Sequence, residues 1–361
     1  MPLIPSSLAD EGSRVGTTVN KLLEVKNLSI AFQTETDVVR PVDDVSFNIY
    51  PGQTLALVGE SGCGKSISAM SILRLLATPP TIYPGGQILF ENEDLLRCSE
   101  RRMQHIRGGQ IAMIFQEPMT SLNPVFTVGE QIIEAVTLHQ HVNTRQGRDI
   151  AAEALADVGI ADPASRLNDY PHQLSGGMRQ RIMIAMALSC LPKLLIADEP
   201  TTALDVTIQA QILELLRKLQ KESGMSILLI THDLGVVAEN ADAVAVMYAG
   251  RIVEYARVED IYDHPQHPYT EGLLASIPRL GRESERLSTI AGVVPAPRNF
   301  PTGCRFHPRC PRMKGDPTCR DILPNLRENR PSQWSACHHA DGYADAPATP
   351  VTIATQREVR H

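Results

Sequence analysis

Apolar and polar positions follow two different periods along this chain, and the period changes near residue 118. In the first part, short apolar runs are bounded by Asp, Asn and Gly, a pattern typical of strands joined by turns. The predicted strands cover residues 22–25, 29–32, 45–49, 55–58, 87–90 and 111–115. The earliest of them predict a small antiparallel sheet ahead of the rest of the fold.

From residue 118 to 189, apolar residues recur at spacings of three and four, which predicts helices. The predicted helices cover residues 128–138, 148–158 and 179–189, within a helical subdomain of about 117–190. Strands and one long amphipathic helix then alternate, with strands at 194–198, 226–231, 242–247 and 251–255 and the helix at 208–222. This alternation indicates an α/β fold with a mostly parallel core. We expect the whole unit to span residues 21–262.

The segment after residue 262 has a different composition, because prolines are dense between Pro265 and Pro331. Proline interrupts helices, so we expect a small, loop-rich accessory domain over residues 263–340. Polar, aperiodic stretches at the two ends predict a flexible leader over 1–20 and a disordered tail over 341–361.

Charge and hydropathy narrow the range of functions. The chain has 361 residues and a net charge of −7, which argues against non-specific nucleic-acid binding. No uncharged apolar run approaches the ~18 residues that cross a bilayer, and the first 20 residues do not resemble a secretory signal. We therefore expect a cytoplasmic protein whose role at a membrane, if it has one, comes through a partner.

One glycine-rich stretch carries the strongest chemical signal. It fits G-x-x-x-x-G-K-[ST] at each fixed position and lies between an apolar run and a helix predicted at 67–76. Backbone N–H groups of such a loop surround phosphate oxygens, the lysine reaches the β- and γ-phosphates, and the hydroxyl binds Mg²⁺. The predicted nucleotide-binding residues are Gly59, Glu60, Ser61, Gly62, Cys63, Gly64, Lys65 and Ser66.

Two acidic residues follow the apolar strand at 194–198. Ligands of parallel sheets bind beyond the carboxyl ends of the strands, so Asp198 is placed to hold Mg²⁺ and Glu199 to act as general base. Ser175, Gly176 and Gly177 precede another predicted helix and form a second N-terminus that suits an anion.

With these motifs in order, the chain resembles an ATP-binding-cassette (ABC) ATPase. The resemblance implies a P-loop core with an antiparallel β subdomain and a helical signature subdomain. It assigns residues 174–180 to the signature motif, in which Ser175, Gly176, Gly177 and Gln180 would complete the ATP site of a partner cassette. It also implies that Gln116 senses Mg²⁺ and the attacking water, that His232 contacts the γ-phosphate, and that Asp205 belongs to the D-loop. An aromatic residue stacks on adenine in this family, and Phe32 is the candidate here.

Residues 114–124, 170–178, 267–270 and 303–311 narrow the resemblance to the ATPases of oligopeptide and dipeptide permeases. This branch implies uptake of di- or oligopeptides, with a second related ATPase subunit, two membrane permeases and an external solute-binding protein as partners. The chain would then lie at the cytoplasmic face of the bacterial inner membrane, with residues near 116–133 docking a permease. Haem, nickel or a peptide-like antibiotic are alternative solutes, and a soluble ABC ATPase outside transport is an alternative function.

Four of the seven cysteines crowd together near the C-terminus with spacings C-x5-C-x8-C-x17-C. Four thiolates in a segment too small to bury much suit a metal, either Zn²⁺ or an iron–sulfur cluster, and unligated thiols are the other possibility. The family resemblance implies a 4Fe–4S cluster held by Cys304, Cys310, Cys319 and Cys337.

Overall fold

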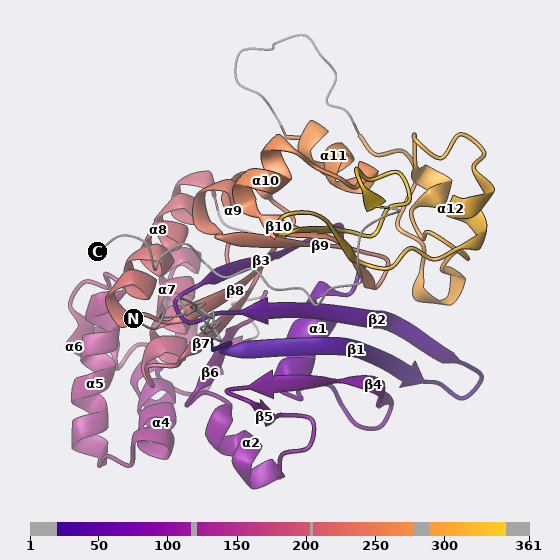
Figure 1. The fold of residues 1–361 in the computed structure, drawn as a ribbon. Helices are drawn as coiled ribbons and strands as arrows, with labels where there is room; N and C mark the ends of the chain where they lie inside the picture. Colours follow the sequence, from indigo (N-terminus) through magenta and orange to yellow (C-terminus); the bar gives the residue numbers. More distant parts are fainter. Residues whose placement is uncertain (1–19, 117–120, 203–204, 278–288, 344–361) are drawn as a thin grey trace, which may run out of the picture.

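The computed structural model describes residues 20–116, 121–202, 205–277 and 289–343. These residues form two sheets with helices packed around them (Figure 1). Nearly all of the predicted leader, and the tail from residue 344, lie outside the described residues, as do Ala203 and Leu204 of the predicted D-loop.

The predicted antiparallel sheet is present. Its strands run in the order β2-β1-β4-β5, with neighbours antiparallel. The two runs predicted at 22–25 and 29–32 form one long strand, β1, with register shifts against both of its neighbours, and β2 and β4 begin well before the runs predicted at 45–49 and 87–90. The bounds are β1 Leu23–Gln33, β2 Val38–Ile49, β4 Thr81–Phe90 and β5 Glu93–Asp94.

The second sheet has eight strands in the order β11-β12-β10-β9-β3-β8-β7-β6. Strands β9, β3, β8, β7 and β6 are parallel, so their carboxyl ends lie along one edge, and β10, β12 and β11 add antiparallel pairings. The bounds are β3 Thr54–Val58, β6 Ile111–Ile114, β7 Leu194–Asp198, β8 Ser226–Thr231, β9 Ala243–Tyr248, β10 Arg251–Arg257, β11 Arg327–Arg330 and β12 Gln333–Ser335.

The helices follow the three- and four-residue apolar spacing, and several begin at side-chain caps. Thr127 and Glu130 form a capping box at the start of α4, and Asn143 and Gln146 form another at α5. The bounds are α1 Lys65–Ile72, α2 Glu100–Ile106, α4 Val128–Gln140, α5 Thr144–Asp157, α6 Pro163–Arg166, α7 Gly176–Leu188, α8 Val206–Ser223, α9 Leu234–Asn240, α10 Val258–Asp263, α11 Pro268–Ala275 and α12 Pro317–Asp321.

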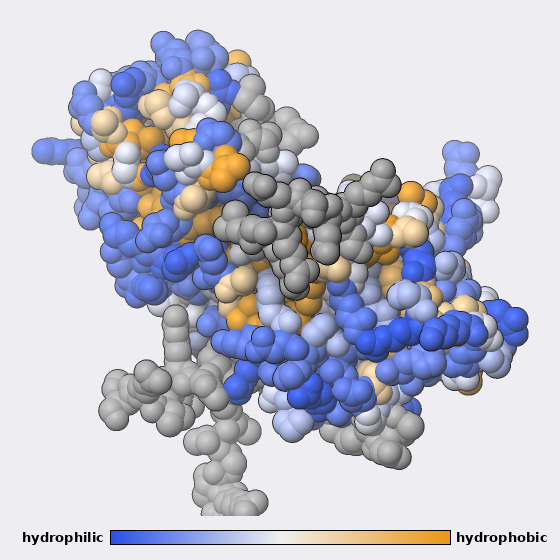
Figure 2. All heavy atoms as spheres, turned by 90° about the horizontal axis from the view of Figure 1, so that it is seen from above, coloured by the Kyte–Doolittle hydropathy of each residue, from blue (hydrophilic) through white to orange (hydrophobic). Residues whose placement is uncertain are grey.

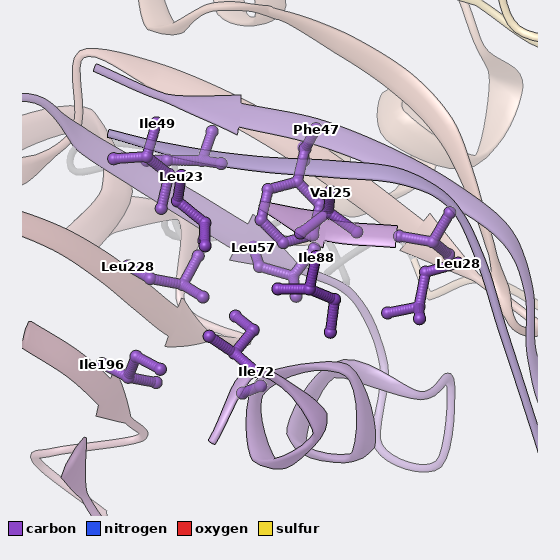
Figure 3. Packing of buried hydrophobic residues seen from close by; sticks show 14 of the residues in the cluster. Leu23, Val25, Leu28, Phe47, Ile49, Leu57, Ile72, Ile88, Ile196 and Leu228 are labelled. Atoms are coloured by element: carbon purple, nitrogen blue, oxygen red, sulfur yellow. The ribbon is translucent and has the colours of Figure 1, made fainter. Parts of the chain in front are cut away.

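One hydrophobic core lies between the two sheets and carries α1. Figure 3 shows Phe47 and Ile88 of the antiparallel sheet approaching Ile72 of α1, with Leu57 of β3 beside them. All four side chains are buried to 1% exposure or less. The strand before the phosphate loop and the helix after it are thus fixed in one packed unit, which holds the loop between them.

The C-terminal segment differs from the accessory domain that the sequence predicts. It is rich in loops, but β12 pairs with β10 and extends the main sheet. Trp334 of β12 is 2% exposed and packs edge-on against Tyr255 of β10, within the same core as the antiparallel sheet. The segment therefore shares its core with the α/β unit.

Polar side chains cover most of the face shown in Figure 2. Within the described part of the chain, we found no helix with both the length and the apolarity needed to cross a bilayer.

Candidate active site

The glycine-rich loop connects β3 to α1, as the sequence predicts. Gly64 is the N-cap of α1 at φ 110°, and it supplies no side-chain hydrogen bond to the helix N-terminus. A Cβ at this position would lie 2.7 Å from Met247 Cε and 2.9 Å from the Pro41 carbonyl oxygen, so only glycine fits. The first N–H groups of α1 are consequently available for an anion.

Lys65 folds back over the loop. Its Nζ donates hydrogen bonds to the carbonyl oxygens of Gly59, at 2.7 Å, and Glu60, at 3.2 Å. Cys63 is buried beside it, and burial raises the pKa of its thiol. Cys63 therefore packs as a neutral side chain behind the loop, while Ser61 and Gly62 are exposed at its tip.

Ser66, in the first turn of α1, meets the end of β7. Its hydroxyl donates to an Asp198 carboxylate oxygen at 3.1 Å. Burial raises the pKa of Asp198, the negative charge of Glu199 acts in the same direction, and the Ser66 hydrogen bond partly opposes both. A hydroxyl and a carboxylate at contact distance are the oxygen donors that Mg²⁺ prefers.

Glu199 is the centre of a small polar network. Its Oε2 accepts hydrogen bonds from Gln116 Nε2, at 3.0 Å, and from the Thr202 hydroxyl, at 2.8 Å. Its Oε1 lies 3.3 Å from Nδ1 of His232, which follows β8. The family resemblance implied that Gln116 and His232 act at the same ATP as Glu199, and the ends of β6, β7 and β8 bring the three side chains together. Thr202 was missed, because a threonine in a turn has no distinctive pattern.

The backbone and electrostatics of Glu199 set it apart. Its φ is 45°, in the left-handed region that costs a non-glycine residue roughly 1–3 kcal/mol and that concentrates at functional sites. Burial acts to raise the pKa of its carboxyl, but the hydrogen bonds from Thr202 and His232 outweigh burial and lower it. Glu199 is therefore held in the ionised form that a general base requires.

These residues open into a pocket of about 670 Å³. One wall comes from the loop and the catalytic candidates, and the other from the C-terminal part of the chain. The lining residues are Gly59, Glu60, Ser61, Gln116, Glu199, His232, Leu273, Gly292, Val293 and Val294. No sequence pattern indicated the last four, which follow no motif.

The signature residues do not line this pocket. Ser175 caps α7 by accepting a hydrogen bond from the Met178 N–H at 3.3 Å, and Gly176 and Gly177 begin the helix. Gln180 is buried and donates to the Pro200 carbonyl, so its side chain ties α7 to the turn after Glu199. Asp205 caps α8 by accepting from the Ile208 N–H at 2.9 Å.

Phe32 also lies away from the pocket lining. It is half-buried near the end of β1, paired with Val39 on one side and Thr81 on the other. Its assignment as the adenine-stacking residue stays a prediction.

The four late cysteines are all free thiols, and three of them are buried. Burial raises the pKa of Cys319 to about 11 and that of Cys337 to about 12, and in both cases the nearby Cys304 and Cys310 add to the shift. The Cys304 N–H donates to the Cys319 carbonyl oxygen at 2.8 Å, so these two stretches of chain lie side by side, and a shared metal site of the four cysteines stays a prediction.

Two further metal-ligating side chains lie beside Cys319, and the sequence did not single them out. Donor atoms of Asp316, Cys319 and His339 lie within 4.8 Å of one another, and the Asp316 carboxylate is 3.1 Å from His339 Nε2. Within the described residues, this group includes only one of the four cysteines.

Comparison with known proteins supports the arrangement. Residues 42–202 match the ABC transporter family, and residues 253–319 match the oligopeptide/dipeptide transporter C-terminal region. The dipeptide transport ATP-binding protein DppD of Bacillus subtilis is 54% identical over 81% of this chain and 88% of its own length. DppD of Escherichia coli is 49% identical over 88% of this chain and 96% of its own length.

The fold also has solved neighbours. The ATP-binding cassette MJ0796, in a dimeric post-hydrolysis state bound to ADP and Pi, aligns with a TM-score of 0.59 at 26% identity, covering 65% of this chain and 98% of that one. The predicted ABC ATPase fold is thus confirmed. The chain belongs to the ABC-transporter ATPases, in the branch that carries the oligopeptide/dipeptide transporter C-terminal region.

Proposed function

We propose that this chain is the ATP-hydrolysing subunit of an importer that takes up di- or oligopeptides. The observation that carries the proposal is the network in which Gln116, Thr202 and His232 surround the Glu199 carboxylate beside the phosphate loop. The dipeptide and oligopeptide transport proteins among its relatives supply the solute class.

The phosphate end of ATP would lie on the first turn of α1. In the structure Lys65 is bonded to loop carbonyls, and we infer that it turns from them to the β- and γ-phosphates when ATP binds. Ser66 and Asp198, with Gln116 nearby, have the donor set to hold Mg²⁺, which would neutralise charge on the phosphate oxygens.

Hydrolysis would begin at Glu199. Its ionised carboxylate accepts a proton from water as the water attacks the γ-phosphorus, and the bond to the β–γ bridging oxygen breaks to give ADP and phosphate. His232 and Gln116 hold the carboxylate on both of its oxygens, and both also line the pocket where the γ-phosphate and the water would lie.

The second half of each site would come from another cassette. Ser175, Gly176 and Gly177 form a helix N-terminus outside this chain's own pocket, which suits the phosphates of ATP bound to a related partner subunit. Gln180 would support that surface from behind, and Asp205 would lie at the same interface.

Permeases would dock near α4. Val125 is 71% exposed and Phe126 is 49% exposed just before this helix, whereas Leu122 is buried in the core. Exposed apolar side chains of this kind mark a surface that a partner covers. Two membrane permeases and an external solute-binding protein would complete an importer that holds this chain at the cytoplasmic face of the inner membrane.

The four late thiols fit a metal cofactor. The sulfurs around a single tetrahedral Zn²⁺ lie about 3.8 Å apart, given a Zn–S bond of about 2.3 Å. Within the described residues, the one group of three metal-ligating atoms that lie within 4.8 Å of one another contains a single cysteine, Cys319. From the resemblance to peptide-permease ATPases we assign a 4Fe–4S cluster to Cys304, Cys310, Cys319 and Cys337, which would cross-link the loops of the C-terminal segment.

Metal analysis after anaerobic purification tests the cysteine assignment. We expect about four iron atoms per chain, in keeping with a 4Fe–4S cluster. A Cys304→Ser variant should lose the iron, and a Cys98→Ser variant, altered far from the cluster in sequence, should keep it. Zinc without iron would replace the cluster with a zinc site, and protein with neither metal would end the proposal.

Co-purification tests the transport function. We expect tagged chain to bring down two integral membrane permeases and a second ATPase subunit from its native membranes, identified by mass spectrometry. A chain that purifies alone, or with ribosomes or nucleic acid, would contradict the proposal.

A further inference from the structure

Glu60, the second residue of the phosphate loop, is held from two sides by the C-terminal part of the chain. Its backbone N–H donates to the Tyr269 hydroxyl at 2.8 Å. Its carboxylate accepts two hydrogen bonds from Arg309, one from Nη1 at 2.7 Å and one from Nη2 at 3.0 Å. A two-point pair between arginine and a carboxylate is both strong and directional.

Arg309 is itself fixed in place. Its side chain is 5% exposed, and its guanidinium lies 5.7 Å from the centre of the Tyr248 ring and 5.9 Å from that of Phe306. Its Nε donates to the Ala291 carbonyl at 2.9 Å, and Nη2 also reaches the Ile290 carbonyl at 3.3 Å. A guanidinium with this many partners has one arrangement available to it.

The segment that Arg309 holds also forms a wall of the nucleotide pocket. Gly292, Val293 and Val294 directly follow the two bonded carbonyls and line the same pocket as Glu60. Arg309 ends the short helix His307–Arg309, next to Cys310. One side chain therefore joins the phosphate loop, the pocket wall and the cysteine region.

We propose that Arg309 is a positioning residue of the nucleotide site, which acts through Glu60 on the phosphate loop. The inference rests on the proposed ATP site. Glu60 places a carboxylate at the loop that would receive a triphosphate. The negative charges of the carboxylate and the phosphates would repel each other. Arg309 neutralises that carboxylate and fixes its position, while Tyr269 holds the backbone of the same residue.

The structure provides a matched control. Arg312 pairs with Glu271 in the same segment, also close to Cys310 in sequence, but its partner does not belong to the phosphate loop. Arg312→Met removes a more exposed, single-contact arginine–glutamate pair from the same segment without touching the loop.

The experiment compares ATP turnover by the purified transporter carrying each variant. We expect Arg309→Met to raise the KM for ATP about tenfold while kcat changes less than about threefold, because binding is lost before chemistry. Arg312→Met should leave both constants within about twofold of wild type. An unchanged KM in Arg309→Met would overturn the proposal.

A second substitution separates charge from folding. With the carboxylate removed, Arg309 has nothing to neutralise, so Glu60→Gln added to Arg309→Met should return KM to within about threefold of wild type. A purely structural arginine predicts no rescue, and a double variant as weak as Arg309→Met would overturn the proposal. Should Arg309→Met fail to assemble, Arg309→Gln keeps a hydrogen-bond donor but removes the charge, so it should still raise KM, and no rise would overturn the proposal.

Failure of this inference differs from failure of the proposed function. Wild-type transporter that does not hydrolyse ATP contradicts the function itself. Wild-type transporter that hydrolyses ATP, with Arg309→Met indistinguishable from it, contradicts only the role of Arg309.

Discussion

Helices α1 and α7 begin in similar ways and differ in what they face. The glycine-rich loop ends at the N-cap of α1, whereas α7 has two glycines as its own first residues, and each helix presents N–H groups that suit an anion. The start of α1 lies beside Asp198, Glu199 and the rest of the pocket. The start of α7 is capped by its own Ser175, and its residues do not line that pocket. The same local chemistry thus serves a site within the chain in one case and, we propose, a partner's site in the other.

The largest effect on kcat is expected from a substitution in the pocket beside the start of α1. Replacing Glu199 with Gln removes the base but keeps the size of the side chain, so kcat of the assembled transporter should fall by roughly 10² to 10⁴. ATP binding should persist, because Lys65, Ser66 and the loop are untouched. Turnover by rapid-mixing phosphate release and binding by fluorescent nucleotide titration measure the two effects.

One result would contradict the assignment of Glu199 as the general base. Wild-type kcat in Glu199→Gln would show that another group accepts the proton. Glu239→Gln, an exposed glutamate in α9, is the matched control and should leave kcat unchanged.

The α7 side is tested at Gly176. A Cβ added there meets no atom within 4 Å, and a glutamate in the first turn of a helix is favourable, so Gly176→Glu should fold normally. In an assembled dimer its charge would repel the phosphates of the partner's ATP. We expect hydrolysis to fall about tenfold or more, because a dimer that cannot close around one site does not turn over.

Binding separates the two helices. ATP affinity of this chain should be unchanged in Gly176→Glu, measured by the same nucleotide titration. If Gly176→Glu instead abolishes ATP binding by this chain, then α7 acts at the chain's own pocket, as α1 does, and not at a partner's site.

The smallest expected effect is on thermal stability and concerns the packing of the C-terminal segment against the main sheet. Glu254 of β10 is fully buried and accepts hydrogen bonds from the backbone N–H groups of Gln266 and His267. Burial raises the pKa of its carboxyl to about 7, from an ordinary value of 4.5. The folded protein therefore keeps a proton that the unfolded chain releases, and a shift of this size corresponds to about 3 kcal/mol.

The sign of the pH dependence follows from this shift. The contribution is fully present below about pH 4.5 and is lost as pH rises through 7, so the Tm of the wild type should fall by several degrees between pH 5 and 8. Glu254→Gln should have a lower Tm at pH 5, because one backbone donor loses its acceptor, and a flatter profile. Glu259→Gln, exposed on α10, should keep the wild-type slope; equal slopes for all three proteins would contradict the assignment.

The α/β core was predictable from the sequence because each of its features is local. Runs of apolar residues fixed the strands, and Gly64 and Lys65 belong to a contiguous motif in a strand–loop–helix context. Asp198 and Glu199 follow from the rule that ligands of parallel sheets bind beyond the strand ends, whereas the roles of Gln116 and His232 came from the resemblance to ABC ATPases.

The C-terminal contribution was not predictable in the same way. Arg309 contacts Glu60 across 249 positions of sequence, and Val293 reaches the pocket from a loop without periodicity. Prolines correctly indicated loops but gave no sign that Trp334 would join the main core. Contacts of this kind depend on tertiary packing, which leaves no short pattern in the sequence.

If ATP hydrolysis by this chain drives peptide import, hydrolysis and uptake must be coupled in the complete transporter. The rate of ATP hydrolysis would be followed in the complete transporter, reconstituted in liposomes, with and without peptide-loaded binding protein. Our account predicts that the peptide-loaded protein raises the rate several-fold and that labelled peptide enters the vesicles together with ATP consumption. A rate that is the same with and without the permeases and peptide would contradict it.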